Sequence, residues 1–157
     1  MGNSVMTDAI QFSIPGTPVG KARARVVQRN GKTHAYTPAK TAAWAESAAW
    51  EARAAMKGRA LLEGPLVVDL WAVFDPPRSD PHRRDHIIKP DLDNIIKCLD
   101  AVNGIVWHDD SQIVKITARK SYGETAAVHV TARVADHIAR NEMDIDFLVA
   151  AEKKPDC

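Results

Sequence analysis

The sequence has little cysteine and no long apolar run. Its 157 residues include two cysteines, Cys98 and Cys157, which is too few for a disulfide framework and does not match the spacing of a zinc site. No apolar stretch approaches the roughly 18 residues that a membrane-spanning helix requires. The chain also does not open with a charged and then apolar signal segment. We therefore expect a soluble intracellular protein with no membrane partner.

Common nucleotide-binding and nucleophile motifs are also absent. The sequence has no P-loop, no glycine-rich dinucleotide pattern, no G-x-S-x-G elbow and no Ser, His, Asp order of a hydrolase triad. We expect no small-molecule organic cofactor. His82 and His86 lie four residues apart in a loop rich in proline, without a helical pattern, which argues against a zinc site.

Charge is nearly balanced in total but unevenly distributed along the chain. The formal net charge is +1, yet residues 15–40 contain no acidic residue and the segment after residue 136 is acidic. The local charge of a surface, more than the net charge of the whole chain, determines which ligands it attracts. A basic loop at about residues 15–37 and a second at residues 78–90 therefore predict phosphate contacts, although a solvated surface hairpin is the commoner use of such a charge run. The candidate contact residues are Lys21, Arg23, Arg25, Arg29, Lys32, Arg83, Arg84 and Lys89.

Hydrophobic patterns and chain breakers predict one α+β domain that spans residues 1–157. Apolar or alternating runs predict four strands, at residues 9–15, 65–74, 112–122 and 126–134. The last two are expected to pair as an antiparallel hairpin. Three helices are expected, at residues 38–58, from residue 91 to about 103, and at about 135–153. The order β-α-β-α-β-β-α indicates a small mixed β-sheet with helices packed on it.

The clearest chemical signal is the stretch KPDLDNIIK, residues 89–97. On a helix that begins near Asp91, Asp93 and Lys97 lie four residues apart on the polar face, and the apolar residues lie opposite. The ordinary interpretation is structural: Asp91 caps the helix, and Asp93 pairs with Lys97. For an isolated motif this interpretation is the more common one.

A second acidic pair, Asp109 and Asp110, follows soon after this helix. A short return of the chain would bring this pair near the start of the helix. Converging carboxylates repel one another unless a cation neutralises them, and their hard oxygen atoms suit Mg²⁺ or Mn²⁺. The pattern predicts a divalent metal site that activates water for phosphodiester cleavage, with a lysine beside it to stabilise the developing charge.

These motifs resemble the RusA family of Holliday junction resolvases. KPDLDNIIKCLDAVNG followed by WHDDSQIV is similar to the core of that family, and GTPVGKARARV is similar to its basic N-terminal segment. The resemblance extends from about residue 10 to residue 134. It implies a RusA-like fold and a homodimer that nicks four-way junction DNA symmetrically with Mg²⁺, or with Mn²⁺ as a substitute. It also implies a cytoplasmic protein of a bacterial cell, encoded by the host or by a phage.

The resemblance also implies roles for individual residues. By position, Asp91, Asp93 and Asp110 match the catalytic metal ligands, Lys97 matches the catalytic lysine, and Asp109 is a supporting neighbour. The basic residues of the two loops would then contact DNA. The interval that follows Lys97 is one residue shorter than in the family pattern, which leaves the rotational register of this lysine open.

Two other functions use the same features. A non-catalytic DNA-binding dimer would use the basic loops, and its aspartates would only cap and pair. A metal-dependent phosphohydrolase of small nucleotides would use the clustered carboxylates but would leave the basic loops without a role.

Overall fold

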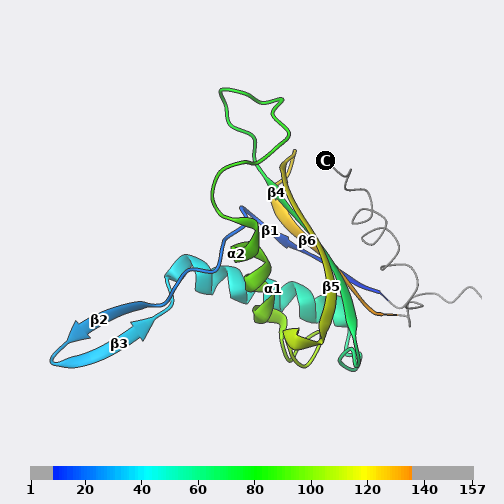
Figure 1. The fold of residues 1–157 in the computed structure, drawn as a ribbon, viewed down its shortest axis with the longest axis horizontal. Helices are drawn as coiled ribbons and strands as arrows, with labels where there is room; N and C mark the ends of the chain where they lie inside the picture. Colours follow the sequence, from blue (N-terminus) through cyan, green and yellow to red (C-terminus); the bar gives the residue numbers. More distant parts are fainter. Residues whose placement is uncertain (1–8, 136–157) are drawn as a thin grey trace, which may run out of the picture.

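The centre of the fold is a four-stranded mixed sheet, in a computed structural model that describes residues 9–135. The strand order is β1-β6-β4-β5. These strands are β1 (Ile10–Pro15), β4 (Leu66–Phe74), β5 (Ile113–Tyr122) and β6 (Ala127–Val134). The helices lie on one face of this sheet (Figure 1). The predicted class, α+β with a small mixed sheet and helices packed on it, is confirmed.

Strand β4 lies between β5 and β6, so the predicted hairpin of the last two strands is wrong. β4 pairs parallel with β5 and antiparallel with β6. Seven of its nine residues are buried, in the pattern BBBeBeBBB, and only a central strand covers both faces and both edges of such a segment. The chain after β5 passes over the end of β4, where the Gly123 N–H donates to the Phe74 carbonyl oxygen at 3.0 Å.

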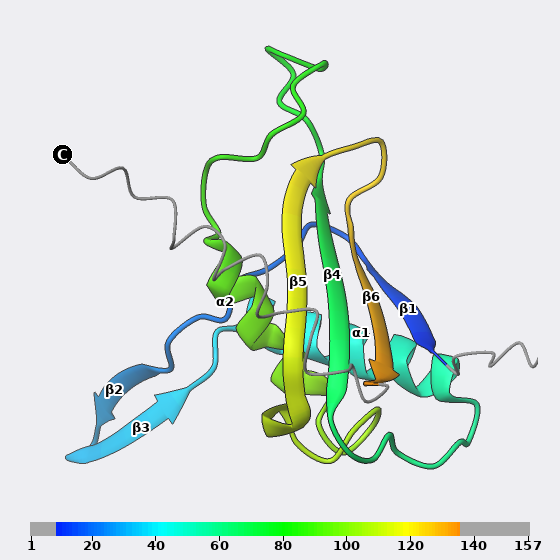
Figure 2. The same ribbon diagram turned by 45° about the vertical axis from the view of Figure 1, so that its right-hand side comes forward.

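The basic segment at about residues 15–37 is only partly a loop. β2 (Arg25–Arg29) and β3 (Lys32–Tyr36) form an antiparallel hairpin that extends away from the sheet (Figure 2). The turn residues Asn30 and Gly31 have φ values of 52° and 68°, which suit the tight turn that Asn-Gly favours. Every residue of both strands is exposed. The exposed hairpin agrees with the surface hairpin that is the commoner use of such a charge run, and the observed element order begins β-β-β-α rather than the predicted β-α.

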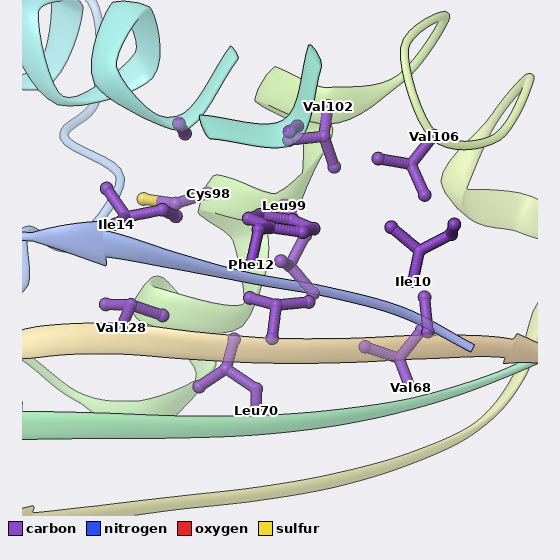
Figure 3. Packing of buried hydrophobic residues seen from close by; sticks show 14 of the residues in the cluster. Ile10, Phe12, Ile14, Val68, Leu70, Cys98, Leu99, Val102, Val106 and Val128 are labelled. Atoms are coloured by element: carbon purple, nitrogen blue, oxygen red, sulfur yellow. The ribbon is translucent and has the colours of Figure 1, made fainter. Parts of the chain in front are cut away.

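The long helix α1 (Ala39–Met56) packs one narrow face on the sheet. Its buried residues are spaced four apart: Trp44, Ala48, Ala52 and Met56. They meet the inward side chains of β1 and β4 in a continuous core (Figure 3). Burial of a large apolar side chain in such a core stabilises the fold by roughly 1.5–3 kcal/mol. Lys57, in the left-handed conformation with φ 49°, ends the helix.

The predicted helix near Asp91 exists but changes type along its length. It begins as the α-helix α2 (Leu92–Ile96) and continues as the 3-10 helix η1 (Lys97–Val102). Its inner face buries Ile95, Leu99 and Val102 as the apolar pattern predicts. Cys98 is also buried, and burial raises the pKa of its thiol to about 11. Cys98 is therefore an unreactive core residue.

The predicted helix at about residues 135–153 lies, apart from its first residue, outside the described residues. Within residues 9–135, no helix is long and apolar enough to cross a membrane.

A buried histidine should make stability depend on pH. Burial lowers the pKa of His86 below its ordinary value of 6.5, and the charge of Lys120 lowers it further. The unfolded chain therefore takes up a proton near pH 6.5 while the folded chain keeps His86 neutral, so folding stability falls as pH falls below 6.5. The expected slope is at most about 1.4 kcal/mol per pH unit. Urea unfolding of the wild type and of His86→Phe, which keeps a ring against Phe74, measures this. An equal pH dependence in both proteins would contradict the assignment.

Candidate functional site

The start of α2 presents two aspartates to solvent. Asp91 has extended backbone angles, φ −69° and ψ 146°, and its carbonyl oxygen accepts the N–H groups of Asn94 and Ile95 at 3.1 and 3.3 Å. Its side chain makes no capping hydrogen bond. Asp91 thus occupies the predicted N-cap position, but its carboxylate does not cap the helix, and this exposed carboxylate is available for other contacts.

Asp93 and Lys97 form the ion pair that their spacing predicts. The Lys97 Nζ atom donates to Asp93 Oδ2 at 2.8 Å across one helical turn. This hydrogen bond is the main reason why the pKa of Asp93 lies below its ordinary value. Both side chains are more than half exposed, so salt and water screen the pair. An incoming charged ligand can compete for either partner.

The first part of the basic segment lies directly against α2 and η1. The Lys21 N–H donates to the Asn94 carbonyl oxygen at 2.8 Å, and the Cys98 thiol donates to the Val19 carbonyl oxygen at 3.2 Å. Between these contacts, the backbone of Gly20 passes close to Pro90: a Cβ atom placed on Gly20 would lie 2.9 Å from the Pro90 Cβ. Glycine thus permits the close approach that brings residues 19–24 to the site.

Lys21 links this segment to Asp100, an acidic residue of η1. Its ammonium group pairs with the carboxylate of Asp100. That hydrogen bond is the main reason why the pKa of Lys21 is raised, and the negative charge of Asp110 adds to the effect. Lys21 therefore ties residues 19–24 to η1.

A polar pocket of about 450 Å³ lies where the segment meets α2. The charged side chains that line it are Lys21, Arg23, Asp93 and Lys97. Three cations and one carboxylate make a pocket that favours an anion, and cationic side chains of this kind bind the phosphates of nucleic acids. The pocket therefore joins the basic segment to the KPDLDNIIK motif in space.

The second acidic pair divides into a structural and an exposed residue. Asp109 precedes the 3-10 helix η2 (Asp110–Gln112), and its Oδ1 accepts the Ser111 N–H at 2.9 Å. The Gln112 Oε1 accepts the Asp109 N–H at 3.2 Å, which completes a capping box. The hydrogen bonds to Ser111 hold the pKa of Asp109 below its ordinary value. Asp110 is the first residue of η2, and it is exposed.

The described residues contain no group of three His, Cys, Asp or Glu side chains placed to share a metal ion. The chemistry of the carboxylates suits Mg²⁺, but Asp93 is engaged by Lys97 and Asp100 is engaged by Lys21. Asp91, Asp93 and Asp110 therefore do not fit a metal cage preformed by three side chains of one chain.

The second basic loop contributes both exposed cations and backbone contacts. Arg83, Arg84 and Lys89 are exposed. Lys120, on β5, donates from Nζ to the carbonyl oxygens of Ile88 at 2.7 Å and Pro90 at 2.9 Å. The sequence analysis missed Lys120 because nothing in the alternating pattern of its strand distinguishes it from any other half-buried lysine.

Comparison with known proteins identifies the class to which this fold and site belong. A model of the endodeoxyribonuclease RusA family matches residues 15–133. The chain therefore belongs to the RusA family, a class of enzymes that cut DNA internally, and the resemblance of its motifs is confirmed. One relative is a protein of Bacillus subtilis (strain 168) described as the uncharacterized protein YqaN. It is 31% identical over 138 residues, which cover 80% of this chain and 96% of the relative.

The close approach of Gly20 predicts a large effect of one methyl group. Gly20→Ala should push residues 19–24 away from α2, because the Cβ atom meets the rigid Pro90 ring at 2.9 Å and the Asn94 Cβ at 3.3 Å. We expect a loss of about 1–3 kcal/mol in the free energy of unfolding and weaker DNA binding. Urea unfolding and a DNA-binding titration measure both effects. Ala60→Ser, at an exposed position between α1 and β4, is the control, and Gly20→Ala behaving like it would refute the prediction.

Proposed function

We propose that this protein is a divalent-metal-dependent endonuclease that resolves Holliday junctions by paired nicks. The observation that carries the proposal is the pocket where Lys21 and Arg23 meet Asp93 and Lys97. Membership of the RusA family supports DNA cleavage as the reaction. In the pocket, the cations bind a backbone phosphate, and the Asp93 carboxylate lies beside it.

Each charged group of the site has a proposed role. Lys21 and Arg23 hold the phosphate, and Lys97 stabilises negative charge that develops on it. The metal ligands are assigned to Asp91, Asp93 and Asp110, and Asp109 supports the last by fixing η2. A Mg²⁺ or Mn²⁺ ion held by these residues would supply an activated water molecule and would neutralise charge at the phosphate. Mg²⁺ keeps several water molecules and takes phosphate oxygens of its substrate as further ligands, so these aspartates need not form a closed cage before DNA binds.

The β2–β3 hairpin offers a second contact surface for DNA. The pairing register places its charged side chains on one face: Arg25 opposite Tyr36, Val27 opposite His34, and Arg29 opposite Lys32. The other face carries the pairs Val26 with Ala35 and Gln28 with Thr33, none of which is charged. A two-stranded ribbon fits the DNA major groove, and cations on one face neutralise phosphates at its walls. With Arg83, Arg84 and Lys89 on the second basic loop, the ribbon would grip DNA on either side of the pocket.

The proposed reaction also requires two copies of the chain. A four-way junction is resolved by two symmetric nicks, and the pocket at Lys21, Arg23, Asp93 and Lys97 would act on one strand at a time. A homodimer with twofold symmetry places two equivalent sites on the junction.

A second candidate is a non-catalytic DNA-binding protein. It is favoured by the structural engagement of two of the acidic residues, since Asp93 pairs with Lys97 and Asp109 caps η2. Such a protein would bind junctions and leave them uncut with any divalent ion.

Substitution of the two exposed aspartates should separate cutting from binding. We expect Asp91→Asn and Asp110→Asn to lower the rate of junction cleavage at least about a hundredfold while junction affinity stays the same or rises, because each loses a negative charge near the DNA. The assay uses a labelled four-way junction with Mg²⁺, a linear duplex of matching sequence, and a parallel binding titration. Asp69→Asn, on an exposed position of β4, is the control.

The outcomes of this assay distinguish the two candidates. Symmetric nicks in the junction by the wild type and the control, but not by the two variants, support a resolvase. Full cleavage by both variants refutes the proposed roles of the aspartates. Tight binding without nicks under any divalent ion supports the DNA-binding protein.

The charged face of the ribbon predicts a change in salt dependence. Replacing Arg25, Arg29 and Lys32 by glutamine should weaken DNA binding and lower the slope of log K against log salt concentration by up to about three, since each phosphate contact contributes about 0.9. Binding titrations at several salt concentrations measure the slope. The matched control is Gln28→Ala with Thr33→Ala on the uncharged face. An unchanged slope in the triple variant would exclude the ribbon from the DNA interface.

A further inference from the structure

Residues 84–90 run along the C-terminal end of β5 on their way to the candidate site. The Tyr122 N–H donates to the Arg84 carbonyl oxygen at 2.8 Å. Asp85 and Ser121 then form an isolated antiparallel bridge. The two segments thus run in opposite directions, and the loop enters the site with its backbone already joined to the sheet.

His86 anchors the same stretch from inside. It is 5% exposed, and its ring stacks on Phe74 with centroids 3.7 Å apart and planes inclined by 17°. The Tyr122 ring covers another side at 5.0 Å. Packing therefore holds residues 84–86.

A different interaction holds the residues that follow. The side chains of Ile87 and Ile88 are 72% and 60% exposed, so packing does not fix this part of the backbone. Instead, Lys120 Nζ donates to the carbonyl oxygens of Ile88 at 2.7 Å and Pro90 at 2.9 Å. An ammonium group has three donors and no acceptor, and hydrogen bonds from a charged donor are among the stronger ones in proteins. Lys120 thus joins two carbonyls of the last three residues before Asp91.

We infer that Lys120 is a positioning residue for the candidate active site, because it fixes the backbone of residues 88–90 and thereby the direction in which the Asp91 carboxylate leaves the start of α2. Its role is to position rather than to react, since its ammonium group donates to the main-chain oxygens of Ile88 and Pro90. The inference deepens the proposed function and rests on it, since the placement of Asp91 matters to cleavage only if Asp91 acts there. A misplacement of about 1 Å can lower a rate by about a hundredfold.

The test compares Lys120→Met with Lys120→Arg in the full chain. Methionine keeps the length of the side chain and removes every donor, whereas arginine keeps the charge and the donors. The control is Lys115→Met, an exposed lysine on the same strand. Three quantities are measured: the single-turnover cleavage rate at saturating four-way junction, the junction Kd, and hydrogen exchange of the peptide that spans residues 84–92.

We expect Lys120→Met to speed hydrogen exchange in that peptide at least about tenfold, because the loop opens locally more often. The cleavage rate should fall about thirty- to a hundredfold while the Kd changes by less than about threefold. Lys120→Arg should restore most of both, and Lys115→Met should behave as the wild type. This separation of rate from affinity, with rescue by arginine, is not expected of a residue that only stabilises the fold.

The remaining outcomes each overturn a defined part of the inference. Unchanged exchange in Lys120→Met shows that the lysine does not hold the loop. Faster exchange with a wild-type cleavage rate shows that the loop does not position Asp91. If the wild-type protein cuts no junction, the proposed function and the positioning role for cleavage fail together, while the exchange comparison still decides whether Lys120 holds residues 88–90.

Discussion

The burial of β4 on both faces is the constraint on which the rest of this structure depends. An apolar strand of this kind takes the centre of a sheet, and here its neighbours are the parallel β5 and the antiparallel β6. Parallel neighbours cannot be joined by a tight turn, so the chain between β4 and β5 must cross from one end of the sheet to the other. That crossover, residues 75–112, carries the second basic loop, α2, η1 and the second acidic pair. The candidate site is therefore built on the connection that the sheet requires.

The charges of the site balance one another within the chain. Lys97 engages Asp93 and Lys21 engages Asp100, so cations occupy the surroundings of the carboxylates before any ligand arrives. The side chains of these pairs are 40–64% exposed, so water and salt screen them. Under the proposed function, a DNA phosphate would compete for the lysines and so free the carboxylates for a metal ion. The same arrangement explains how a pocket for an anion and an acidic motif can share one surface.

The sheet stabilises the fold, whereas the β2–β3 ribbon offers an exposed surface for contacts. The core of the fold lies between the sheet and the helices, and the ribbon adds nothing to it because all of its residues are exposed. Two strands alone are marginally stable in water, so the ribbon can adjust its shape on a partner at little cost. Residues 88–90 show the opposite design, in which hydrogen bonds from the sheet hold an exposed stretch in place beside Asp91. Adaptable and fixed elements thus lie on either side of the same pocket.

The sequence by itself determined the local features of this protein and its family. The helix near Asp91, its buried face and the Asp93–Lys97 pair follow from contacts between residues three or four apart, which periodicity reveals directly. Only the tertiary structure decided how distant segments meet. It placed β4 between β5 and β6, laid residues 19–21 against α2 and η1, and brought the Lys120 side chain to the carbonyl oxygen of Pro90, 30 residues away. Such contacts depend on which strands pair and on how much apolar surface each placement buries, and no short stretch of sequence contains that comparison.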